Sequence, residues 1–250
     1  IDEAFKYEIE NSILSPSKIE SKLSIIALVG DNMRDHQGIS GKMFSALGKN
    51  NINVKAISQG SSERNITAVI REKDVKKALN TLHEKFFEKN IKQLNLFIVG
   101  IGNVGSKLID QIEKQTDYLA KKLKLKLRII AISNSKKMLF DESGLTLSNL
   151  KEDIDNGENS NLDEFFKRIK KLNLRNSVFI DNTASSKIAG FYQNFLKNNI
   201  SVVTCNKIAC SDSYSSYIEL KKLASKYDTS FLYETNVGAG LPIIDTLNNL

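Results

Sequence analysis

The chain of 250 residues carries a formal net charge of +7, from 36 lysines and arginines against 29 aspartates and glutamates. Its 41% hydrophobic and 26% charged residues are typical of a folded globular protein and exclude intrinsic disorder as the default state. The positive charge is spread along the predicted helices instead of gathering in one stripe, so we expect no nucleic-acid partner despite the basic balance.

The only cysteines, Cys205 and Cys210, are too few for a disulfide framework and have no histidine partners at metal-ligand spacing. No run of the sequence approaches the roughly 18 apolar residues that a membrane span needs, and the start lacks a signal-peptide pattern. We therefore expect a cytoplasmic protein with no membrane partner. The chain begins with Ile1 and stops at Leu250 directly after a patterned stretch, so we expect it to be a piece of a longer protein.

The first part of the chain predicts a small module in the order strand, helix, strand, strand, helix. The strands are expected at residues 24–30, 53–58 and 66–71, and apolar residues recur at helical spacing after the first and third of them. This order is that of a ferredoxin-like fold without its closing strand, and we assign it to residues 23–92. Residues 1–22 fit no unit and are expected to be the tail of a preceding regulatory region.

After Lys92 the pattern changes to alternating strands and helices, which is typical of a parallel sheet with helices on both faces. Strands are expected at residues 94–99, 125–132, 178–180, 201–204 and 230–233, and a loop with a short helix at 141–160. The fold class is therefore α/β, with a doubly wound, Rossmann-type domain over residues 93–235 following the ferredoxin-like module.

The first strand of this domain leads into a glycine-rich turn of the form GxGxxG. Gly100 permits a tight turn, Gly102 lets the backbone approach a diphosphate, and Gly105 allows the next helix to pack on the strand. The helix N-terminus then offers N–H donors to the anion. In this strand-to-helix context the turn indicates a nucleotide-binding site, with a purely structural glycine turn as the alternative.

The second strand ends at a polar segment with no acidic residue, although NAD-preferring domains usually place one there for the ribose hydroxyls. Instead it carries Lys136 and Lys137, which could meet a 2′-phosphate and so favour NADP over NAD. An ordinary pair of solvated lysines is the alternative.

The remaining strand ends also carry polar residues. Residues 181–185, DNTAS, could hydrogen-bond a nicotinamide ribose or simply cap the next helix. Lys207 follows the next strand, where a lysine in a Rossmann cleft is more often a ligand or a proton-transfer group; an ordinary surface charge is the alternative. Residues 234–242 contain paired glycines that leave carbonyls accessible, or form only a hinge between domains. His36 and His83 are isolated, so we expect no metal or base role for them.

These motifs together resemble a known family. The segments VGIGNVG (99–105), DNTAS (181–185), TCNK (204–207) and NVGAGLPII (236–244) resemble homoserine dehydrogenase. The segments IALVGDNMR (26–34) and ISQGSSERNI (57–66) resemble the second ACT repeat of the bifunctional aspartokinase/homoserine dehydrogenases. The resemblance covers nearly the whole chain in the correct order.

The resemblance implies a threonine-regulated, cytoplasmic, homo-oligomeric enzyme of threonine and methionine biosynthesis. An upstream kinase domain would phosphorylate aspartate with ATP and magnesium, and the dehydrogenase would reduce aspartate semialdehyde to homoserine with NADPH, NAD remaining possible. Gln59 matches a threonine-sensing position, and Lys207 matches the catalytic and cofactor-binding lysine near the nicotinamide. The implied cofactor-binding residues are Gly100, Ile101, Gly102, Asn103, Val104, Gly105, Thr183 and Lys207. The implied ligands of a monovalent cation, usually sodium, are Glu234, Val237, Ala239 and Leu241.

Two departures from the family pattern limit what this chain can do. Cys205 stands where the family usually has proline, which we expect to loosen the turn before Lys207. Residues 236–250 would be only the start of the catalytic domain, whose substrate-binding Asp and Lys would lie beyond Leu250. We therefore expect this chain to bind cofactor without turning over substrate by itself. Two alternatives stay open: a non-catalytic ACT–Rossmann sensor, and a stand-alone homoserine dehydrogenase.

Overall fold

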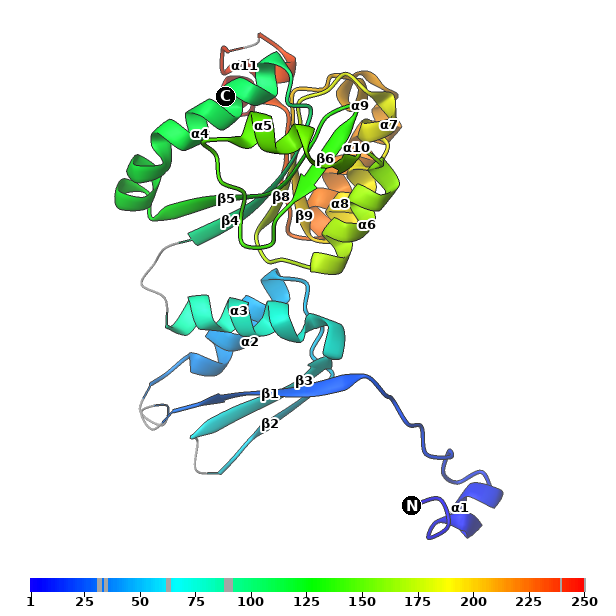
Figure 1. The fold of residues 1–250 in the computed structure, drawn as a ribbon. Helices are drawn as coiled ribbons and strands as arrows, with labels where there is room; N and C mark the ends of the chain where they lie inside the picture. Colours follow the sequence, from blue (N-terminus) through cyan, green and yellow to red (C-terminus); the bar gives the residue numbers. More distant parts are fainter. Residues whose placement is uncertain (31–32, 34–35, 62–63, 88–91, 239, 250) are drawn as a thin grey trace. The chain divides into compact units, whose positions relative to one another are not determined.

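The computed structural model describes residues 1–30, 33, 36–61, 64–87, 92–238 and 240–249 (Figure 1). Contacts within the chain divide it into two compact units. One comprises Ile1–Gln37 with Asn53–Lys76, and the other comprises Gly38–Ile52 with Lys77–Leu250. Among the described residues, no helix is both long and apolar enough to cross a membrane.

The first unit is built on a small antiparallel sheet. Its strands are β1 (Leu23–Val29), β2 (Ala56–Gln59) and β3 (Asn65–Arg71), in the order β1-β3-β2, and a short helix α1 (Lys6–Glu10) precedes them. Alternate residues of β1 and β3 are buried, as expected for strands with one face on a core. The described part of this sheet has these three strands and lacks the fourth strand that closes a complete ferredoxin-like fold.

Two helices complete the order of elements predicted for the ferredoxin-like module, residues 23–92. Helix α2 (Ile39–Lys49) follows β1, and helix α3 (Val75–Phe86) follows β3 after the 3-10 turn η2 (Glu72–Asp74). Both helices bury one face, with Met43 and Leu47 in α2 and Ala78 and Leu82 in α3. The order strand, helix, strand, strand, helix is therefore confirmed, and with it the ferredoxin-like class of the module.

The second unit contains a seven-stranded sheet in the order β10-β9-β8-β4-β5-β6-β7. Five strands are parallel, and the pair at one edge is antiparallel. The parallel strands are β4 (Lys92–Val99), β5 (Leu125–Ser133), β8 (Ser177–Asp181), β9 (Ile200–Thr204) and β10 (Phe231–Leu232), and the antiparallel pair is β6 (Lys137–Phe140) and β7 (Glu158–Asn159). The doubly wound parallel sheet is confirmed, whereas β6 and β7 were missed because they contain only four and two residues.

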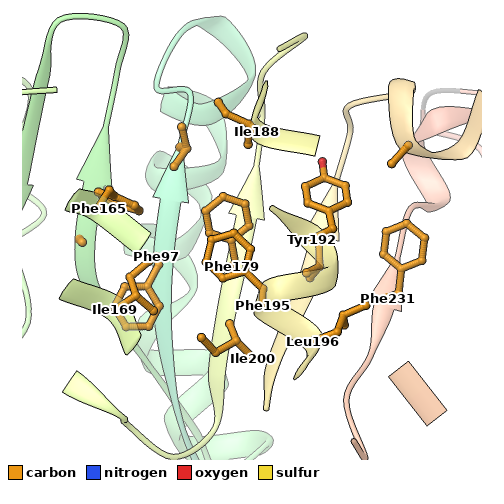
Figure 2. Close-up of a cluster of buried hydrophobic side chains, with 14 of the residues drawn as sticks. Phe97, Phe165, Ile169, Phe179, Ile188, Tyr192, Phe195, Leu196, Ile200 and Phe231 are labelled. Carbon is orange, nitrogen blue, oxygen red and sulfur yellow. The ribbon is translucent and has the colours of Figure 1, made fainter. Parts of the chain in front are cut away.

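Helices cover both faces of this sheet (Figure 1). On one face α4 (Asn103–Lys122) and α5 (Leu150–Asp155) bury a cluster that includes Ile98 and Ile109. On the other face α6 (Leu162–Leu172), α8 (Tyr192–Lys197) and α10 (Tyr214–Lys226) bury an aromatic cluster (Figure 2). Two short helices, α7 (Ser186–Ala189) and α8, follow one another between β8 and β9.

The aromatic cluster holds the middle of the sheet to its helices. Phe179 of β8 stacks on Phe195 of α8 with ring centroids 3.9 Å apart, and the Tyr192 ring is fully buried beside them (Figure 2). Burying one such ring stabilises the fold by about 1.5–3 kcal/mol. The cluster therefore fixes β8 and β9 against α8, directly beneath the ends of the strands.

Candidate dinucleotide-binding site

The turns that carry the predicted site residues meet at the carboxyl end of the parallel sheet. Strands β4, β8 and β9 are neighbours, with Val99 paired to Asp181 and Asp181 paired to Thr204. The segments that follow these three strands therefore emerge side by side. This edge of an open α/β sheet is where ligands bind.

Two positions of the glycine turn after β4 have no room for a side chain. Gly100 has φ +86, and a Cβ there would lie 2.7 Å from Thr183 Cγ2. A Cβ on Gly105 would lie 2.0 Å from the carbonyl oxygen of Gly100, so any side chain would push α4 away from the strand. Gly102 differs, because a Cβ there would have no atom within 4 Å. Two glycines thus close the turn, and the third leaves space above it.

The space above Gly102 fits the diphosphate of a dinucleotide. Gly102 is the N-cap of the 20-residue helix α4, without a side-chain cap and without an acidic residue in the first turn. The exposed first turn therefore offers its backbone N–H groups and the positive end of the helix dipole to an anion. The side-chain amide nitrogen of Asn182 is buried and has no hydrogen-bond partner among the described residues. That nitrogen lies 3.3 Å from the Cβ position of Gly105, at the same turn.

The two lysines after β5, Lys136 and Lys137, have different surroundings in the structure. The Asn134 side-chain oxygen accepts hydrogen bonds from the backbone N–H of Lys136 and of Lys137, at 2.8 and 2.7 Å. The Lys137 ammonium donates to the Gly157 carbonyl oxygen at 3.0 Å, which ties β6 to the segment before β7. The Lys136 side chain is exposed. Of the two, Lys136 is the lysine available to a ligand phosphate.

The segment after β8 is a tight polar turn. The Thr183 N–H donates to an Asp181 carboxylate oxygen at 2.8 Å, and the Thr183 hydroxyl oxygen accepts from the Ser185 N–H at 3.1 Å. Ser185 is the N-cap of α7, but its side chain makes no capping hydrogen bond. The methyl group of Thr183 lies beside Gly100, and its hydroxyl only accepts in this turn, which leaves the hydroxyl proton for a ligand oxygen.

The segment after β9 carries Lys207, which is exposed and begins helix α9 (Ile208–Ser211). Because Cys205 stands in place of proline, we expected this turn to be loose. The structure instead ties the turn at Cys205. Its backbone N–H donates to the Asp181 carbonyl oxygen at 3.1 Å, a hydrogen bond that proline cannot make. Burial, and secondarily the nearby Asp181 carboxylate, raises the pKa of the Cys205 thiol. The thiol is therefore a poor nucleophile at neutral pH.

A buried polar cluster that the sequence analysis missed lies directly under these two turns. The fully buried Asp181 carboxylate accepts hydrogen bonds from the Tyr192 hydroxyl at 2.6 Å and from the Asn206 side-chain amide at 3.0 Å. The Thr204 hydroxyl lies 2.8 Å from that of Tyr192. Burial, then the charge of Asp181, raises the pKa of the Tyr192 phenol well above its ordinary range. The sequence did not point to Tyr192, because the other buried residues of its helix are apolar and the pattern indicates only a core position.

The segment after β10 carries the predicted cation ligands, and the oxygens of two of them already accept hydrogen bonds from backbone N–H groups. The Glu234 carboxylate oxygens accept from the backbone N–H groups of Ile244 and Asp245, at 2.8 and 2.9 Å, and so cap helix α11 (Ile243–Asn248). The Leu241 carbonyl oxygen accepts from the Ile243 N–H. Val237 is half exposed, and Ala239 lies outside the described residues. A cation here would share its oxygens with backbone amides, and the cation site stays a prediction.

A parallel sheet with a GxGxxG turn at a helix N-terminus, and polar turns beside it, defines a dinucleotide-binding domain of the Rossmann type. The model of the family described as "Homoserine dehydrogenase, NAD binding domain" matches residues 100–234, and the model of the ACT domain matches residues 26–86. The chain belongs to the homoserine dehydrogenase NAD-binding family and carries an ACT domain before it.

Known proteins similar to this chain agree with that assignment. The bifunctional aspartokinase/homoserine dehydrogenase of Haemophilus influenzae is 42% identical over 100% of this chain and 31% of its own length. That of Buchnera aphidicola is 42% identical over 98% of this chain and 30% of its own length. The chain thus spans about a third of these relatives. A mutant hyperthermophilic archaeal homoserine dehydrogenase, solved in complex with NADPH, is 25% identical with a TM-score of 0.52, over 64% of this chain and 49% of that one.

Proposed function

We propose that this chain binds NADPH across the carboxyl ends of β4, β5, β8 and β9, as the cofactor domain of a homoserine dehydrogenase. The observation that carries the proposal is the open space at Gly102, bounded by the N-terminus of α4 and closed beneath by Gly100 and Gly105. The backbone at Ile101, Asn103 and Val104 would hold the diphosphate. The archaeal homoserine dehydrogenase of similar fold was solved with NADPH, which supports this choice of cofactor.

The two ends of the cofactor would meet different residues. Lys136 would bind the 2′-phosphate, because its ammonium is exposed whereas that of Lys137 is bonded to the Gly157 carbonyl. The Thr183 hydroxyl and the Lys207 ammonium would bind the nicotinamide half. When bound, NADPH supplies the hydride that reduces a carbonyl carbon. Lys207, beside that half, would orient the ring or hold a proton near the reacting carbonyl.

The larger enzyme would couple this domain to an aspartokinase, as the names of the H. influenzae and B. aphidicola relatives state for those proteins. The reaction would be reduction of aspartate semialdehyde to homoserine, the kinase using ATP and magnesium and the assembly being a homo-oligomer. The ACT domain supports regulation by a small amino acid, which we propose to be threonine bound at Gln59, an exposed residue at the end of β2. Glu234, Val237, Ala239 and Leu241 would hold a sodium ion.

The test of cofactor binding is a fluorescence titration of this chain with NADPH. Gly102→Asp places a carboxylate where the diphosphate would lie, so we expect it to weaken binding about 10-fold or more. Gly41→Asp is the matched control, because Gly41 also has no atom near its Cβ position but lies in α2. Absence of NADPH binding by the unaltered chain, or equal binding by Gly102→Asp, would contradict the proposal.

A second experiment separates the dehydrogenase from a non-catalytic sensor of dinucleotide and amino acid. The full-length gene product is assayed for oxidation of homoserine with NADP, with and without threonine. Turnover that threonine depresses supports the regulated enzyme. Tight NADPH binding without turnover would instead support the sensor.

A further inference from the structure

The carboxylate of Asp181 links the two turns that carry Thr183 and Lys207. One of its oxygens accepts the backbone N–H of Thr183 at 2.8 Å. The other accepts the Tyr192 hydroxyl at 2.6 Å and the Asn206 side-chain amide at 3.0 Å. The carboxylate is fully buried, so these three donors replace the water that it would otherwise bind.

Asn206 fixes the backbone on both sides of its neighbour Lys207. Its side-chain nitrogen donates to Asp181 and also to the Ser185 carbonyl oxygen at 3.0 Å. Its side-chain oxygen accepts the Ile208 N–H at 3.1 Å, which lies just after Lys207. Every polar atom of this buried side chain is therefore bonded, and each bond ends on a turn of the candidate site.

The hydroxyls of Tyr192 and Thr204 complete the hydrogen-bonded cluster. The Tyr192 hydroxyl donates its proton to the Asp181 carboxylate. The Thr204 hydroxyl can donate to the Tyr192 oxygen at 2.8 Å or to the Asp181 carbonyl oxygen at 3.3 Å, and its own oxygen accepts the Asn206 backbone N–H at 2.8 Å. In either pattern the cluster joins the end of β8 to the end of β9.

We propose that Asp181 and Asn206 are positioning residues that set the spacing of Thr183 and Lys207 and so form the floor of the nicotinamide half of the site. This inference rests on the proposed binding of NADPH. A comparison within the same sheet supports it. Asn95, equally buried, bonds the Arg175 carbonyl, Arg128 and Gln93, none of which belongs to a turn of the site. The cluster around Asp181, in contrast, joins the two turns directly.

The test compares two ligands and two matched variants by fluorescence or calorimetric titration. The ligands are NADPH and 2′-phospho-ADP-ribose, which is NADP without its nicotinamide. Asn206→Ala is expected to weaken binding of NADPH about 10-fold and to change that of 2′-phospho-ADP-ribose less than about 2-fold. Asn95→Ala removes a buried, multiply bonded Asn of the same sheet, and should leave both affinities unchanged while lowering thermal stability.

The outcomes separate positioning from general destabilisation and from failure of the proposed function. Equal weakening of both ligands by Asn206→Ala, or of neither, overturns the inference. If Asn206→Ala does not fold, Tyr192→Phe keeps the ring in its core, removes one donor to Asp181, and should weaken NADPH alone by a smaller factor. Binding of neither ligand by the unaltered chain would reject the proposed function itself.

Discussion

Replacing Gly105 by alanine tests whether the glycine turn closes as the structure describes. The added Cβ would lie 2.0 Å from the Gly100 carbonyl oxygen and 2.9 Å from its carbon, whereas ordinary contact begins at 3.4 Å. Because both groups are backbone, relief requires moving α4 away from β4 by roughly 1 Å or more, in an interior packed at crystal density. Such overpacking costs about 1–3 kcal/mol.

The expected result is a fall in Tm of roughly 4–8 °C, since about 2 kcal/mol moves Tm by that amount in a chain of this length. Thermal unfolding followed by circular dichroism measures it. Gly102→Ala is the control, because its Cβ meets no atom within 4 Å and its cost is limited to about 1 kcal/mol at a helix N-cap. A Gly105→Ala protein that unfolds at the temperature of the unaltered chain would refute the described packing of α4 on β4.

Three further predictions concern single side chains of the site. Burial raises the pKa of Tyr192 in the folded state above its ordinary 10.0, so the contribution of this phenol to the free energy of unfolding should be fully present below pH 10 and be lost as the pH rises further. Between pH 8 and 11, Tm should therefore fall less with pH in Tyr192→Phe than in the unaltered chain. Cys205→Pro removes the N–H bonded to the Asp181 carbonyl and should lower the free energy of unfolding in urea by about 1 kcal/mol, and equal or greater stability would count against that bond. Lys136→Ala should weaken NADPH more than NADH, whereas Lys137→Ala should lower Tm without changing that preference, and the reverse pattern would exchange their roles.

The sequence predicted those parts of the fold that local pattern controls. The apolar runs before Gly100 and at residues 125–132 predicted buried strands, because a parallel strand covered on both faces has no polar alternation. The alternation of strands and helices predicted that helices such as α4, α6 and α10 connect the parallel strands, and the three glycines located the turn between β4 and α4. These features depend on residues within one or two turns of each other, so one sequence suffices to find them.

The missed strands β6 and β7 show where local pattern fails. They contain four and two residues and carry Lys137 and Glu158 at the antiparallel edge, so neither alternation nor a long apolar run marks them. Their pairing depends on β5 as a template and on the bond from Lys137 to Gly157. A short edge strand is stable only when its partner already exists.

The amino-acid sequence by itself determined the two modules, the order of their elements and the glycine turn, because helical and strand periodicity and glycine chemistry act between near neighbours. Tertiary structure alone decided which of Lys136 and Lys137 is free, and that Asp181, Tyr192 and Asn206 form one buried cluster. Tyr192, in α8, and Asn206, in the loop after β9, lie 11 and 25 residues after Asp181. Such hydrogen bonds form only after the parallel sheet has brought the ends of its strands together and excluded water from between them.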